Sequence, residues 1–195
     1  MSLITITTEN YKYLRNLLYA TLVSGIFIFS ARACLTNCSI DLNFTGIYID
    51  ETCEVVINND SSNEIITLPR ISTASLQNNG SEAGSVPFDI TLKNCPASHT
   101  VTLFFDSSVT AADNKTGNLV NRTGLTYSDN VQIRLRKENS SQVIIDDAAS
   151  GQDYIISSAA DPISHRFTAS YYANGDAVVT AGKVYAIAGV ELVYK

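Results

Sequence analysis

Apolar and polar side chains alternate along short segments of this chain, and the first clear case is the segment 39–45. Ile40, Leu42 and Phe44 fall on one face of an extended segment, while the residues on either side of each are polar. A period of two residues is typical of a β-strand with one buried face. The segment therefore predicts a strand whose apolar face needs a groove to fill, either in the same molecule or in a neighbour.

The same alternation recurs up to the last residues of the chain. Its short runs are rich in Val, Ile, Phe, Tyr and Thr, and they are separated by Asn, Asp, Gly and Ser. After residue 34 no segment shows the sustained 3.6-residue period of an amphipathic helix. This pattern is typical of a β-sandwich or barrel. The predicted strands are 53–57, 64–71, 86–93, 101–105, 131–136, 143–145, 154–156, 165–173 and 183–195, with long loops at 72–85 and 106–130.

Residues 1–33 have the features of an export signal. Lys12 and Arg15 precede an apolar run, and Ala31-Arg32-Ala33 then fits the small-x-small rule for signal cleavage. The run is shorter than the roughly 20 apolar residues that cross a bilayer. Two alternatives stay open, a buried N-terminal helix and lipidation of Cys34, which the neighbouring arginine disfavours. We expect a helical signal peptide that is cleaved after residue 33, followed by export.

Length and charge narrow the classes of function. The 195 residues include 19 acidic and 13 basic side chains, which gives a formal net charge of −6. This balance is the opposite of what nucleic-acid binding requires, so we expect no nucleic-acid partner. Once the signal is removed, the remaining length suits a single core.

The four cysteines are Cys34, Cys38, Cys53 and Cys95. Export to an oxidising compartment makes disulfides the default, and four cysteines allow three pairings. We favour Cys53–Cys95 together with Cys34–Cys38. Cys53 and Cys95 bound two predicted strands, whereas the other two share an N-terminal tail.

Catalytic and metal-binding patterns are missing from the sequence. His99 and His165 are the only histidines, so they form no pair that could complete a zinc site, and there is no Gly-x-Ser-x-Gly motif or recognisable carboxylate pair. Asp146-Asp147 falls short of the six or more ordered oxygens that calcium requires. Arg134 and Arg136 are most simply a solvated strand face. We therefore expect no enzyme and no cofactor.

The two ends of the predicted sandwich complement each other. The last predicted strand stops at residue 195, so no later strand covers its edge, and exposed edges are normally covered. The N-terminal segment 39–45 offers a spare strand with an apolar face. We therefore expect the arm of one subunit to complete the next, in an open head-to-tail contact that generates a filament.

Several short motifs occur in order along the chain. They are Phe44-Thr45-Gly46 with Cys53 seven residues after the glycine, Leu68-Pro69-Arg70-Ile71-Ser72-Thr73, Val86-Pro87-Phe88-Asp89-Ile90-Thr91-Leu92-Lys93-Asn94-Cys95, Tyr171-Tyr172-Ala173, Ala181-Gly182-Lys183-Val184 and the penultimate Tyr194. Together they resemble the chaperone–usher pilus subunits, specifically the family of the type 1 fimbrial major subunit. The resemblance covers nearly all of the chain after the signal.

This resemblance implies an incomplete immunoglobulin-like β-sandwich of six strands that lacks its seventh, C-terminal G strand. It implies three parts: a signal peptide at 1–33, a donor-strand arm at 34–45 and the pilin domain at 46–195. The family's disulfide would be Cys53–Cys95. The arm would insert Ile40, Leu42 and Phe44 into the neighbour's groove, and the groove strand that meets chaperone and donor would carry Val190, Leu192 and Tyr194.

The implied partners are neighbouring pilin subunits, a periplasmic chaperone and an outer-membrane usher, and the implied location is a cell-surface fimbria that supports adhesion. The arm departs from the family pattern because no glycine precedes Gly46 within it. Two alternatives remain: a minor adaptor or tip-associated subunit, and a self-complete secreted immunoglobulin-like binding module. The second would need its own final strand and would not depend on residues 34–45.

Overall fold

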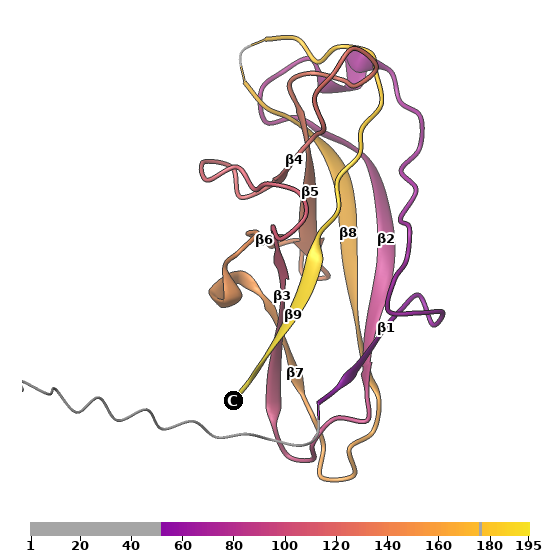
Figure 1. Cartoon of the computed structure of the whole chain (residues 1–195), viewed down its shortest axis with the longest axis vertical. Coiled ribbons are helices and arrows are strands. Elements are labelled where there is room, and N and C mark those ends of the chain that lie inside the picture. The colour runs from indigo at the N-terminus through magenta and orange to yellow at the C-terminus, as the bar shows by residue number, and fades with distance from the viewer. Residues whose placement is uncertain (1–51, 176) are drawn as a thin grey trace, which may run out of the picture. The chain divides into compact units, whose positions relative to one another are not determined.

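Two β-sheets pack face to face in the computed structural model, which describes residues 52–175 and 177–195 (Figure 1). The larger sheet has the strand order β1-β2-β8-β5-β4, with β6 also paired to β5, and the smaller sheet has the order β7-β3-β9. All named strand pairs are antiparallel. The strands are β1 (Glu54–Ile57), β2 (Glu82–Lys93), β3 (Thr100–Asp106), β4 (Leu119–Val120), β5 (Val131–Lys137), β6 (Gln142–Val143), β7 (Gln152–Ile155), β8 (Ile163–Ala173) and β9 (Gly189–Tyr194).

The all-β sandwich expected from the alternation is confirmed. The described residues contain nine strands rather than six, and the additional β4, β6 and β7 are short. Helical structure is limited to two 3₁₀ turns, η1 (Thr73–Leu76) and η2 (Ala148–Ser150). Within this described part, no helix has the length and apolar character needed to cross a membrane.

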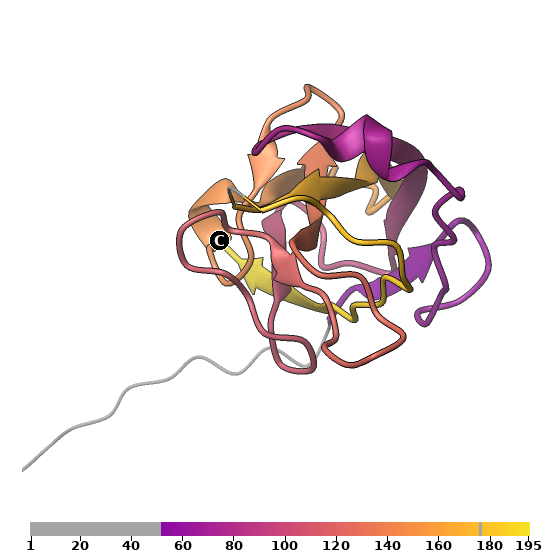
Figure 2. The same cartoon turned by 90° about the horizontal axis from the view of Figure 1, so that it is seen from above.

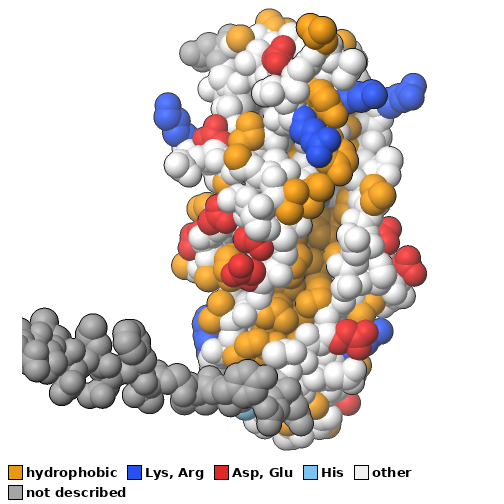
Figure 3. Space-filling view, in the orientation of Figure 1, with side chains coloured by type: hydrophobic (Ala, Val, Ile, Leu, Met, Phe, Trp, Pro, Cys, Tyr) orange, Lys and Arg blue, Asp and Glu red, His pale blue; other side chains and the backbone are white. Residues whose placement is uncertain are grey.

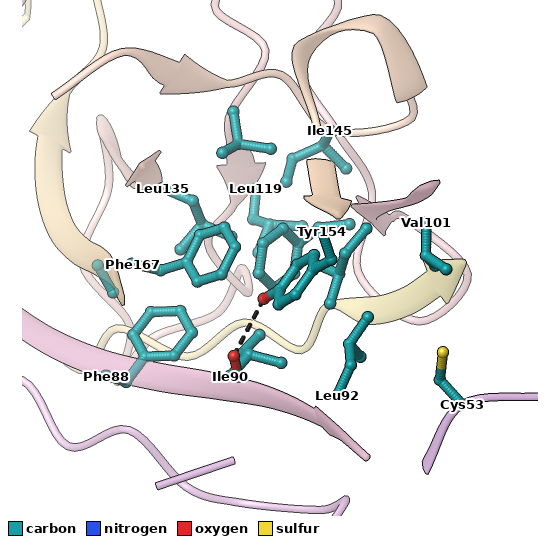
Figure 4. Close-up of a cluster of buried hydrophobic side chains, with 14 of the residues drawn as sticks. Cys53, Phe88, Ile90, Leu92, Val101, Leu119, Leu135, Ile145, Tyr154 and Phe167 are labelled. Carbon is teal, nitrogen blue, oxygen red and sulfur yellow. Dashed lines mark hydrogen bonds between the residues drawn. The ribbon is translucent and has the colours of Figure 1, made fainter. Parts of the chain in front are cut away.

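The core lies between the two sheets and is built from the inward faces of β2, β3, β5 and β8 (Figure 4). The rings of Phe88 and Phe167 stack with centroids 5.7 Å apart, and Phe105 meets Phe167 edge-on at 5.4 Å. The hydroxyl of the fully buried Tyr154 donates a hydrogen bond to the carbonyl oxygen of Ile90, 3.0 Å away. Burial of this ring raises the pKa of Tyr154.

Strand β2 starts earlier than predicted, because residues 82–85 belong to it rather than to a loop. A bulge between Ala83 and Val86 separates the two parts of its pairing with β8. Gly84 in this bulge has a φ of +66°, and a Cβ atom there would lie 2.8 Å from the ring of Tyr171. Only glycine meets both requirements, so the bulge depends on this residue.

Two segments predicted as strands do not form strands. In the described part of the chain, residues 64–71 make no backbone–backbone hydrogen bond, and Pro69 lacks an N–H group. Residues 183–188 continue past the end of β3. The backbone of Lys183 pairs with the loop residues Thr126 and Ser128, and the next backbone donors find side-chain partners. The N–H of Tyr185 donates to Asn121 Oδ1 at 2.8 Å, and that of Ile187 donates to Thr110 Oγ1 at 2.9 Å.

The prediction that Arg134 and Arg136 form a solvated strand face is wrong. Both pair with Glu82 on the outer face of the larger sheet, and the Arg134 side chain is only 12% exposed. The guanidinium of Arg134 also lies 3.7 Å from the ring centroid of Tyr172. Hydrogen bonding from Arg136 is the largest cause that lowers the pKa of Glu82. The pair therefore ties β2 to β5 across the intervening β8.

Candidate functional site: an open groove between the sheets

A strip of apolar side chains runs along the sandwich between β9 and the segment 64–71 (Figure 3). We call it the groove. The apolar side chains that border the groove pack on the core and are only partly buried. They are Ile57, Ile66 and Leu68 on one wall, and Val184, Ala186, Ala188, Val190, Leu192 and Tyr194 on the other. Seen along the long axis, β1 and β9 border the same side of the sandwich (Figure 2).

The first wall of the groove is the outer edge of β9. Leu192 lies opposite Leu103, and the N–H of Lys195 donates to the carbonyl of Thr100 at 2.9 Å. Hydrogen-bonded and non-hydrogen-bonded pairs alternate in an antiparallel ladder, so the backbone groups of Glu191 and Val193 face β3. Those of Val190, Leu192 and Tyr194 therefore point away from β3, along the free edge.

Side-chain burial on β9 follows the same alternation. The side chains of Val190, Leu192 and Tyr194 are partly buried on the core, whereas those of Glu191 and Val193 are exposed. The three predicted groove residues thus combine an inward apolar side chain with an outward backbone edge. This is the arrangement that an added β-strand requires.

The opposite wall is formed by β1 and the segment 64–71. Val55 lies opposite Leu92, and the N–H of Asn58 donates to the carbonyl of Asp89 at 2.8 Å. By the same alternation, the backbone groups of Cys53 and Val55 face away from β2. Since residues 64–71 make no backbone–backbone hydrogen bond in the described part, the second wall is also largely unpaired.

The groove is closed at one end. The N–H of Cys53, which faces outward from β1, donates a 2.7 Å hydrogen bond to the hydroxyl of Tyr194 near the end of β9. A disulfide joins Cys53 to Cys95, which is the pairing favoured from the sequence, and their Cα atoms are 4.2 Å apart. The start of the first strand is thus fixed both to the end of β2 and to the last strand.

The two walls run in opposite directions. The start of β1 at Cys53 meets the end of β9 at Tyr194, and both strands border the same groove. A strand added between them must be antiparallel to one wall and parallel to the other. The sequence predicted the strand at β9, and its role as a groove wall stays a prediction. Ile66 and Leu68, which alternate with exposed neighbours, were interpreted as part of an ordinary strand.

The chemistry that the groove offers is apolar contact and backbone hydrogen bonding. Among the apolar side chains that border the groove, Tyr194 adds a hydroxyl. Across residues 52–175 and 177–195, no three His, Cys, Asp or Glu side chains are grouped so that they could hold a metal ion. The predicted arm residues Ile40, Leu42 and Phe44, the Cys34–Cys38 pairing and the signal peptide lie outside the described residues.

A β-sandwich with an apolar groove between two unpaired edges defines a class of domain that is completed by an added strand. Comparison with known proteins identifies the family. The family model described as fimbrial protein matches residues 42–195. The F17 fimbrial protein of Escherichia coli is 33% identical over 161 residues, covering 79% of this chain and 86% of that protein.

A second relative is the serotype 2 fimbrial subunit of Bordetella pertussis, which is 30% identical over 177 residues, covering 77% of this chain and 84% of that protein. The crystal structure of the P pilus rod subunit PapA shares the fold, with a TM-score of 0.58 at 20% identity, covering 73% of this chain and 99% of that one. The chain belongs to the fimbrial protein family. It is a structural subunit of a fimbria, a surface fibre in which such subunits assemble with one another.

Proposed function

We propose that this subunit polymerises by strand exchange, in which the arm of one copy fills the groove of the next. Residues 1–33 direct export and are removed, and residues 34–45 then form the arm. Ile40, Leu42 and Phe44 enter the apolar strip, while their backbone pairs with the free edge of β9. The observation that supports this proposal is the groove itself, which has apolar walls and an unpaired backbone edge on each side.

The energetics of the proposed contact are favourable. Burying the three apolar side chains of the arm at about 1.5–3 kcal/mol each supplies about 5–9 kcal/mol. Each backbone hydrogen bond to β9 adds about 1 kcal/mol. Burial of the groove side chains adds to this free energy, because Val190, Leu192 and Tyr194 lose their remaining contact with water.

We orient the arm antiparallel to β9, since antiparallel ladders are slightly more stable per residue than parallel ones. The start of the arm then lies near Tyr194, at the closed end of the groove. Its last residue, Thr45, lies near Val184, at the other end. The chain that joins the arm to its own domain leaves the groove at that open end.

An open apolar groove is an aggregation hazard before assembly, because exposed strand edges pair with other chains. We propose that a periplasmic chaperone covers the β9 edge during export and that an outer-membrane usher exchanges it for the arm. The alternative of a self-complete secreted module requires a strand in this groove from the domain itself. The part of the chain that the structure describes places none there.

Strand complementation tests this function. The chain lacking residues 1–45 is produced in the periplasm with a chaperone, and a synthetic peptide of residues 34–48 is added. We expect the peptide to release the chaperone and to raise the melting temperature strongly. The control peptide carries Ile40→Asp, Leu42→Asp and Phe44→Asp and should do neither. A truncated chain that is stable alone and ignores the arm peptide would refute strand exchange.

A further inference from the structure

Two segments at the open end of the groove are bound tightly to each other. We call residues 121–130 and 178–185 the loop pair. The N–H of Ser128 donates to the carbonyl of Lys183 at 2.9 Å, and the N–H of Lys183 donates to that of Thr126 at 2.9 Å. The hydroxyl of Ser128 reaches the carbonyl of Thr180 at 2.6 Å. The loop pair is therefore an ordered surface of fixed shape.

This ordered surface presents apolar side chains to solvent. Leu125 is fully exposed on a turn closed by a 2.9 Å hydrogen bond from the N–H of Tyr127 to the carbonyl of Gly124. Val178 is 68% exposed and Tyr185 is 44% exposed. These three side chains give the loop pair apolar surface that a partner can bury. Because the loop pair is already ordered, it loses little conformational entropy when a partner binds.

The length of the chain before the domain indicates which partner arrives there. In the proposed assembly, the arm of a second copy ends at residue 45 beside the open end of the groove. Only residues 46–51 then separate it from the second copy's own domain, a span of at most about 20 Å. The base of the second domain must therefore lie within about 20 Å of the open end of the groove, where the loop pair also lies. That base comprises residues 52–53, 94–99 and 156–162, which are joined by the Cys53–Cys95 disulfide and by the N–H of Ser98 to the carbonyl of Ser157 at 3.1 Å.

Charge supports the same partner. The loop pair carries Arg122, whose guanidinium lies 4.3 Å from the ring centroid of Tyr185, and Lys183. The base of the second copy carries the exposed Asp161. Opposite charges at the rim of a contact favour the correct approach and disfavour wrong partners.

We propose that the loop pair is a second contact surface between consecutive subunits, on which the base of the next copy of this chain sits. This inference rests on the proposed strand exchange. The arm supplies the tether, and the loop pair fixes the angle at which one domain follows the next. The contact joins different surfaces of identical subunits, so it repeats along an open fibre without closing into a ring.

Photocrosslinking in assembled fibres tests the contact. The full chain is expressed with p-benzoylphenylalanine at position 125, and a second strain carries it at Val109 as a control, since this residue is also exposed. We expect covalent dimers from position 125 only, with the crosslinked peptide from residues 46–54, 94–99 or 156–162 of the second copy. Absence of dimers, a crosslink elsewhere on the second copy, or a crosslink to a different protein would overturn the proposal.

A substitution gives the energetic test. Leu125→Asp should make joints between subunits dissociate roughly ten- to a hundredfold faster in denaturant, because one buried leucine is lost from the contact. Val109→Asp should dissociate like the parent fibre. Binding of the peptide 34–48 to the arm-deleted chain should be the same for Leu125→Asp and the parent. If the peptide does not bind the parent, strand exchange and the loop-pair contact are both refuted. If the peptide binds normally and Leu125→Asp fibres dissociate at the parent rate, the loop-pair contact alone is refuted. Weaker peptide binding by Leu125→Asp would also refute it, since the residue would then serve the groove.

Discussion

The hydrogen bond between Cys53 and Tyr194 closes one end of the groove, and Tyr194→Phe removes it without changing the shape of the ring. The bond is 2.7 Å long and spans 141 residues of sequence. Cys53 is 9% exposed, so water cannot easily replace the lost hydroxyl as partner of its N–H. Leaving a buried donor unsatisfied costs about 1–3 kcal/mol. We expect a loss near the middle of this range, about 2 kcal/mol.

The assay is thermal unfolding of the arm-deleted chain saturated with peptide 34–48, so that only the domain and its completed groove are measured. For a domain of about 150 residues, 2 kcal/mol corresponds to a fall in melting temperature of roughly 4–8 °C. Tyr185→Phe is the matched control, because the same hydroxyl is lost from a tyrosine whose side chain is 44% exposed. Equal melting temperatures for the two variants would refute the argument that this bond holds the groove closed.

Three further outcomes follow from the groove, the disulfide and the partly buried ion pairs of Glu82. Leu192→Asp should abolish fibres in electron micrographs and binding of the arm peptide, whereas Val193→Asp, with its side chain on the outer face of the same strand, should keep both. Cys95→Ser opens a disulfide with a sequence separation of 42 and should cost about 4 kcal/mol, measured by denaturant unfolding. Hydrogen bonding from Arg136 lowers the pKa of Glu82 from its ordinary value of 4.5, so the stability that this pair supplies is present above pH 4.5 and is lost as the pH falls through the lowered pKa. Melting temperatures from pH 7 to pH 3 should therefore fall more steeply for the parent than for Glu82→Gln, and parallel curves would contradict this.

Alternation in the sequence predicted which side chains face the core, because burial of one face requires it. It could not predict which strands would find a hydrogen-bonding partner. Segments 64–71 and 183–188 both alternate and both place apolar side chains on the core, yet neither has a strand beside it. Side-chain period reports burial, whereas strand formation depends on a neighbour that arrives from elsewhere in the chain or from another subunit.

Contacts between residues far apart in the sequence explain the other differences between the predicted and the observed structure. Glu82 lies in a segment that was predicted as a polar loop, and it pairs with Arg134 and Arg136, which are more than fifty positions later in the chain. Nothing local to either segment indicates that contact. The strand that carries Val190 and Leu192 was predicted from the sequence because its alternation continues almost to the last residue.

The position of the Cys53–Cys95 disulfide has a mechanical consequence for the fibre. In a fibre assembled by the proposed strand exchange, tension enters each domain after the last residue of its arm, Thr45, and reaches Cys53 before it reaches β1. Strand β1 is only four residues long and would peel from β2 under a modest pull. The covalent bond passes the load directly to the end of β2, a twelve-residue strand paired on both sides. The force then spreads through the larger sheet, and each domain resists extension as a single body.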